Sequence, residues 1–213
     1  MKKIIFFIAL ILPSMAIFAQ SDKYNGAMKQ QIAKIEKAFQ DGSFPDLANS
    51  FERIGDAEKT QWLPYYYAAY AQVMSALIGT DKSKLDAMAD KADQLITKAE
   101  TVAGAPNSET NVIRSMIATA HLTVDPPSRW QTYGQESAAY LEKAKQLDPT
   151  NPRPVYLEGQ SKFYTPEAFG GGKLVAAPYF EKAISMFDTF KPASEIAPSW
   201  GKASAQYFLS QCK

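Results

Sequence analysis

The chain has 213 residues, enough for one domain with a substantial hydrophobic core. Hydrophobic residues make up 46% of it and charged residues 21%, proportions that exclude an intrinsically disordered protein. The 23 basic and 22 acidic residues nearly balance. Because no basic excess is present to neutralise a phosphate backbone, we do not expect nucleic-acid binding.

Residues 1–19 have the pattern of a secretory signal peptide. Two lysines give a basic start, Ile4–Leu12 is an unbroken apolar run, and small residues lead to an expected cleavage site after Ala19. The alternative, a membrane anchor, is disfavoured because a spanning helix needs about 20 apolar residues. We therefore expect a mature domain of residues 20–213, with no membrane-spanning segment, in the periplasm or outside the cell.

The only cysteine, Cys212, lies at the opposite end of the chain from this apolar run. A lipid anchor attached to a cysteine behind the signal peptide is therefore not expected. A lone cysteine cannot form an internal disulfide, so we expect a free thiol, with a disulfide-linked dimer as the alternative.

The mature chain has the pattern of one helix after another. Apolar residues recur at intervals of three and four, and no segment alternates with the period of a strand. Glycine, asparagine and proline mark the expected ends. The sequence predicts an all-α fold with helices over Tyr24–Phe39, Asp46–Ile54, Trp62–Ile78, Lys84–Val102, about 108–122, Arg129–Leu147, about 152–163, a segment ending near Phe187, and about Pro198–Gln211.

Small and apolar residues recur with one spacing in three of these helices. The sets are Ala92, Ile96 and Ala99; Ser137, Leu141 and Ala144; and Ala176, Phe180 and Ala183. Small side chains at these intervals let paired helices approach closely. Gly159 lies inside a helix, where glycine costs roughly 1 kcal/mol relative to alanine, so we expect a packing role for it.

These residues resemble the tetratricopeptide repeat. Ser137–Pro149 matches the second helix of such a repeat, the next unit opens at Pro152, and Gly159 takes the family's small position. The resemblance is specific over residues 129–187, where Thr165–Gly172 carries five extra residues. It implies an α-α superhelix of three to four degenerate repeats, followed by a C-terminal capping helix.

In that family the first helix of each pair lines a concave surface. With Ala69 and Gly159 at the small positions, the resemblance implies that tyrosines and their neighbours face a groove. Tyrosine combines a large contact area with a polar tip, which suits recognition of a ligand. The alternative is that the rings fill the core. The candidate groove residues are Tyr66, Tyr67, Tyr70, Arg153, Tyr156, Gln160, Phe163 and Tyr164.

Two other motifs do not indicate catalysis. Gly170–Lys173 lacks the preceding strand and the Ser or Thr of a phosphate-binding loop, so we interpret it as a connection between helices. The alternative is a functional loop with Phe169 and Lys173 as contacts. His121 is the only histidine and has no nearby cysteine or second histidine for a metal site, which favours a packed or helix-end role.

The sequence therefore favours an exported, non-enzymatic scaffold that holds a protein or peptide partner of the cell envelope in its concave groove. The alternative is a small-molecule-binding or transport-accessory protein, in which the 165–172 loop and the C-terminal helix close the groove into a pocket. We expect no catalytic residue, no metal site and no cofactor.

Overall fold

The computed structural model describes residues 22–213, and within that range the chain is helical with no β-strand. The expected all-α fold is therefore confirmed. The expected signal peptide, residues 1–19, lies outside the described residues. No helix in residues 22–213 is long and apolar enough to cross a membrane.

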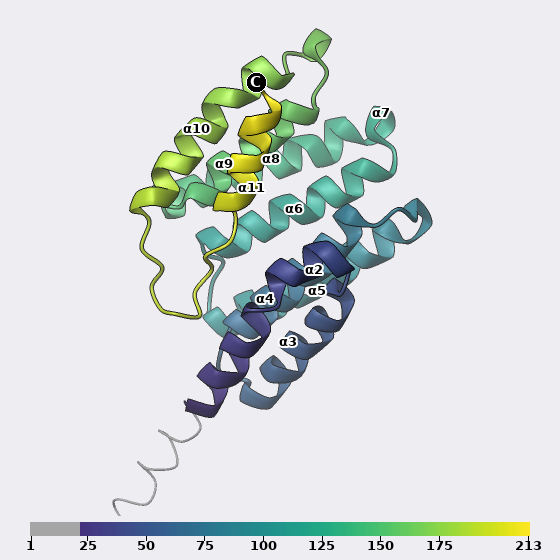
Figure 1. Cartoon of the computed structure of the whole chain (residues 1–213). Coiled ribbons are helices and arrows are strands. Elements are labelled where there is room, and N and C mark those ends of the chain that lie inside the picture. The colour runs from purple at the N-terminus through teal and green to yellow at the C-terminus, as the bar shows by residue number, and fades with distance from the viewer. Residues whose placement is uncertain (1–21) are drawn as a thin grey trace, which may run out of the picture.

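Consecutive helices pack against one another, so the molecule is a stack of helices (Figure 1). A first helix over residues 22–32 precedes the others. They are α2 (Ile35–Asp41), α3 (Phe44–Glu58), α4 (Leu63–Ile78), α5 (Leu85–Ala103), α6 (Ser108–Val124), α7 (Pro126–Arg129), α8 (Gln135–Leu147), α9 (Pro152–Tyr164), α10 (Lys173–Thr189) and α11 (Lys202–Gln211).

Local signals set most of the helix ends. The Asn107 side chain accepts a hydrogen bond from the Thr110 amide at 3.0 Å, and the Thr110 hydroxyl accepts one from the Asn107 amide, which closes a capping box at the start of α6. Gly42 ends α2 with a φ of 73°, a conformation that glycine adopts without steric cost.

Three predicted helices differ from the structure. The expected helix Tyr24–Phe39 is interrupted by a turn at residues 33–34. The expected helix Arg129–Leu147 begins with the short α7 and a π-helical turn, Trp130–Gly134, before α8. The last helix begins at Lys202, because residues 198–200 are not helical and Trp200 stacks on Tyr70 of α4.

The small residues lie where helices meet. Ala92, Ala99, Ala144, Ala176 and Ala183 are all fully buried. At Gly159 a Cβ atom would lie 2.8 Å from Cε1 of Phe180 and 3.0 Å from Cβ of Tyr179. Helices α9 and α10 therefore approach so closely that only glycine fits, which confirms the predicted packing role of Gly159.

Candidate functional site

Five of the eight expected groove residues lie in the interior. Tyr66, Tyr67 and Tyr70 on α4 are at most 2% exposed, and Arg153 and Tyr156 on α9 are at most 5% exposed. The expectation that they line an open groove is therefore wrong for this structure. The surface that they form with α6 is covered by the chain's own residues 190–201, here called the strap.

The strap makes specific contacts with these residues. The Tyr67 hydroxyl donates a hydrogen bond to the Ile196 carbonyl at 3.1 Å. The Trp200 ring stacks on Tyr70 with centroids 4.7 Å apart, and its indole N–H donates to the Tyr66 hydroxyl at 2.9 Å. The expected groove residues thus do hold a non-helical segment, but that segment belongs to the same chain.

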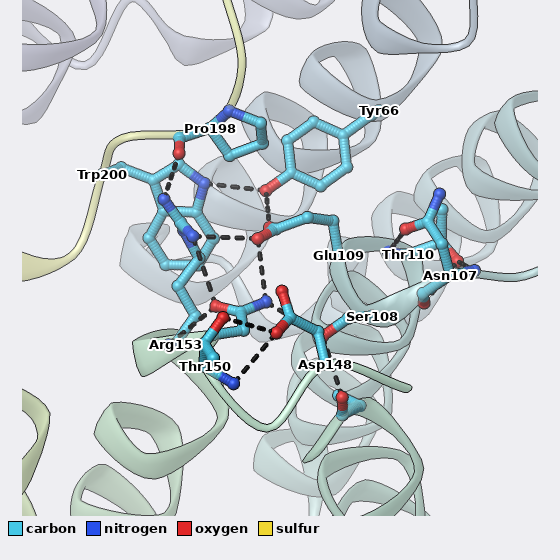
Figure 2. A network of polar contacts seen from close by, with 12 residues as sticks. Tyr66, Asn107, Ser108, Glu109, Thr110, Asp148, Thr150, Arg153, Pro198 and Trp200 are labelled. Atoms are coloured by element: carbon cyan, nitrogen blue, oxygen red, sulfur yellow. Dashed lines mark hydrogen bonds and ion pairs between the residues drawn. The ribbon is translucent and has the colours of Figure 1, made fainter. Parts of the chain in front are cut away.

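Arg153 and Glu109 form the centre of a buried polar network (Figure 2). Arg153 Nη1 lies 2.8 Å from Glu109 Oε1, and its Nη2 donates to the Pro198 carbonyl of the strap. Its guanidinium also lies 5.2 Å from the ring centroids of both Phe190 and Trp200. A buried charge needs such pairing, because removing it from water is costly.

Glu109, in the first turn of α6, has partners for both carboxylate oxygens. The Asn151 amide donates to Oε1 at 2.8 Å, and the Tyr66 hydroxyl donates to Oε2 at 2.9 Å. Burial raises the pKa of this carboxyl, against the lowering effect of Arg153. Both oxygens of Glu109 are thus engaged in contacts that join α6 to α4 and to the start of α9.

The other three expected residues lie toward the opposite end of α9. Gln160 and Phe163 are half-buried, and Tyr164 is 71% exposed. Helix α11 packs beside them, so that the ring of Phe208 lies 5.2 Å from Phe163 and 5.9 Å from Tyr164 between centroids.

Tyr207, the neighbour of Phe208, is 61% exposed. We call Phe163, Tyr164, Tyr207 and Phe208 the aromatic face. Its two tyrosines are exposed, while Phe163 and Phe208 are half-buried against the core. Exposed apolar surface that is continuous with such rings is a candidate binding surface.

The 165–172 loop lies at the same end of the molecule as the C-terminus of α11 (Figure 1). It is fixed by backbone hydrogen bonds, including one from the Gly172 amide to the Lys162 carbonyl at 2.9 Å, and Gly172 has a φ of 99°. The loop leaves Phe169 80% exposed, and the following Leu174 is 84% exposed. The conformation of Gly172 agrees with the predicted role of glycine in an inter-helix connection. The loop also leaves apolar side chains in solvent near the end of α9.

A hollow of about 470 Å³ surrounds His121 on the side of α5, α6 and α8. His121 Nδ1 lies 2.7 Å from Asp86 Oδ1, and the imidazole stacks on Tyr133 of the π-helical turn. Hydrogen bonds from Arg129 and His121 lower the pKa of Asp86 to about 2. His121 is thus a packed residue, as predicted.

The rim of this hollow carries three carboxylates, those of Asp90, Asp93 and Glu136, against the single cation Arg114. Arg114 is itself paired with Glu100 and, at 2.7 Å, with Asp93. Among residues 22–213, no three His, Cys, Asp or Glu side chains lie together as a metal site would require. The hollow therefore disfavours an anionic ligand.

Comparison with known proteins identifies a relative with the same fold. No family model matches the chain, and no curated protein does. Among solved structures, the HusA haemophore from Porphyromonas gingivalis matches with a TM-score of 0.79 and 37% sequence identity, over 89% of this chain and 92% of that chain. The chain belongs to the HusA family. The helical architecture is therefore that of a HusA-type protein, while no match supports membership of the tetratricopeptide family itself.

Sequence reasoning missed half of the aromatic face. Tyr207 and Phe208 were placed in a capping helix without a role, although consecutive apolar residues in Tyr207–Leu209 cannot all face one core. Trp200 and Glu109 were missed for a different reason. Their importance depends on contacts with residues that are distant in the sequence, which no local pattern reports.

Proposed function

We propose that this chain is an exported porphyrin-binding protein that takes haem or a related macrocycle on its aromatic face. The observation that supports it is the exposed aromatic face on a chain that shares 37% identity with a haemophore. This favours the small-molecule alternative over the peptide scaffold, because the strap and α11 already cover five of the residues that would hold a peptide.

The chemistry of a porphyrin suits this surface. The macrocycle is flat and apolar, with carboxylates along one edge, so it needs aromatic rings to stack on and cations beside them. Tyr164, Phe163 and Tyr207 offer rings, and Lys162 and Lys173 lie on the flanking end of α9 and start of α10. Gln160 lies one turn below and can donate a hydrogen bond to the ligand.

The hollow at His121 is the weaker site for the same ligand. Histidine is a common haem ligand, and the Nδ1 contact with Asp86 is typical of iron-binding imidazoles. The carboxylates of Asp90, Asp93 and Glu136 would, however, repel porphyrin carboxylates. His121 therefore provides a matched control for the aromatic face.

Export and repeat type belong to this proposal. The basic and apolar pattern of residues 1–19 supports secretion to the periplasm or the exterior. The paired helices with buried small residues support a tetratricopeptide-like superhelix. An envelope protein that receives the ligand would be a natural partner, and no enzymatic step is needed.

Titration of the purified protein with haemin, and separately with iron-free protoporphyrin, tests the proposal through the porphyrin absorbance band. We expect Tyr164→Ser with Tyr207→Ser to weaken binding at least about tenfold, as loss of two contact rings does. His121→Ala should bind as the wild type does. Equal affinity for haemin and protoporphyrin indicates stacking, whereas a strong preference for haemin indicates iron ligation by a tyrosine.

Three other results would contradict parts of this proposal or all of it. Unchanged affinity in the double variant would remove the aromatic face from the proposal, and loss of binding in His121→Ala would move the site to the hollow at His121. A wild-type protein that binds neither porphyrin contradicts the proposed function altogether.

A further inference from the structure

The C-terminal arm, residues 190–213, joins the covered groove to the aromatic face. Its first part is the strap, and its second part is α11, which carries Tyr207 and Phe208 (Figure 1). One residue, Gly201, separates Trp200 from the start of α11. The two parts are therefore directly continuous in the chain.

The junction between strap and helix is tightly packed. Gly201 has a φ of 115°, and a Cβ atom there would lie 2.6 Å from Cζ of Phe187. On the strap side, Trp200 is fixed by Tyr70 and Tyr66, and on the helix side Ala205 is fully buried. The packing of Trp200 on Tyr70 and Tyr66 therefore sets the direction in which α11 leaves the strap.

Helix α11 depends on this anchoring. It has ten residues, and an isolated helix of that length is marginal in water. Its contacts are with α10 and α9, through the stacking of Phe208 on Phe180 at 5.5 Å between centroids and its contact with Phe163. If the strap leaves its groove, α11 loses its fixed start, and the aromatic face loses two of its four rings.

We infer that the strap is a clasp: its seating against Tyr66, Tyr70 and Arg153 assembles the porphyrin surface, and its release dismantles that surface. The inference rests on the proposed function. The groove that the sequence assigned to an external peptide is then a control element, and a partner that displaces the strap would make the protein release its ligand. Linkage requires that porphyrin binding, in turn, hold the strap in place.

The strap carries a convenient reporter of its own opening. Glu195 lies in it, with an exposed side chain paired to Lys29. A glutamate-specific protease needs several residues in an extended, freed conformation, so the rate of cleavage after Glu195 follows the open fraction. The fragment 196–213 identifies this cut by mass.

The test measures protoporphyrin affinity and cleavage after Glu195 in the wild type and three variants. Trp200→Ala should bind protoporphyrin about fivefold or more weakly, the lower range of known couplings, and should be cut faster. Saturating protoporphyrin should slow cleavage of the wild type by a similar factor. Trp200→Phe, which keeps the stacking on Tyr70, should restore most of the affinity, and Trp130→Ala, an exposed tryptophan outside the arm, should behave as the wild type does.

Suppose that the wild type binds protoporphyrin, that the ligand does not slow its cleavage, and that Trp200→Ala binds as tightly as the wild type. These results would overturn the clasp and leave the proposed function intact. Tighter binding by Trp200→Ala would overturn it as well, since the strap would then compete with the ligand. Absence of binding by the wild type would overturn both. Far-ultraviolet circular dichroism of Trp200→Ala and Trp200→Phe verifies that the helices remain folded.

Discussion

The two ends of α9 carry similar residues in contrasting surroundings. At its start, Arg153 and Tyr156 are buried beneath the strap and α11, whereas at its end Tyr164 is 71% exposed. Both ends follow from the same helical register, so register alone does not decide which residues are available to a ligand. The covering segment decides it, and that segment comes from the far end of the chain.

The largest effect should come from the buried end. Arg153→Ala leaves Glu109 without its cation and the Pro198 carbonyl without its donor. Breaking one partner of a buried ion pair costs about 3–5 kcal/mol in the free energy of unfolding. For a domain of this size that corresponds to a melting temperature lower by roughly 6–20 °C.

Arg53→Ala is the matched control, because Arg53 is exposed and its recorded partner is Ser50 on the same helix. It should change the free energy of unfolding by less than about 0.5 kcal/mol. If Arg153→Ala and Arg53→Ala have the same melting temperature, the polar network does not stabilise the buried end of α9. The two ends of α9 would then not differ in the way proposed.

A smaller effect is expected midway along α9. Gly159→Leu places a side chain where even a Cβ atom would lie 2.8 Å from Phe180, so α10 must move away. Overpacking of this kind costs about 1–3 kcal/mol. Thermal unfolding measures it, with Gly26→Ala as the control.

Gly26 lies in the helix over residues 22–32, and no heavy atom lies within 4 Å of a Cβ built there. Alanine at that position should stabilise the protein by up to about 1 kcal/mol, as helix propensity predicts. Opposite signs for the two variants would confirm that α9 and α10 meet at Gly159. An unchanged melting temperature in Gly159→Leu would contradict the close crossing.

The crossing at Gly159 shows what could be predicted from sequence. The spacing of Ala176, Phe180 and Ala183 is local and recurs in two other helices, and the structure buries these three residues and Gly159. Asparagine was likewise predicted to mark helix ends, and at the start of α9 the Asn151 side chain accepts a hydrogen bond from the Arg153 amide at 3.0 Å. Patterns within one or two helices are therefore reliable guides to the scaffold.

The site could be predicted only in part. Phe163 and Tyr164 were named as ligand contacts, but so were Tyr66 and Tyr70, which the strap covers. The strap has no helical periodicity, and Trp200 meets its partner Tyr66 across 134 positions of sequence. Nothing in a local pattern indicates such a contact, because it arises from the path of the whole chain.

The last comparison removes one hydroxyl from each of two tyrosines, and it includes the smallest expected effect, that of Tyr207→Phe. Tyr66→Phe deletes the hydrogen bonds to Glu109 and from Trp200, which should cost about 1–3 kcal/mol because buried partners are left unsatisfied. Tyr207→Phe removes a hydroxyl from a side chain that is 61% exposed, and stability should change by less than about 0.5 kcal/mol. Chemical denaturation measures both.

Porphyrin binding should then rank the two variants differently. Tyr207→Phe retains the ring, so protoporphyrin affinity should persist if the macrocycle stacks on the aromatic face, and a loss confined to haemin would mean that the phenol oxygen binds iron. Tyr66 lies away from the aromatic face, so Tyr66→Phe can change porphyrin affinity only through the strap. If the two variants have the same free energy of unfolding, the covered groove and the aromatic face do not differ in the way that their burial implies.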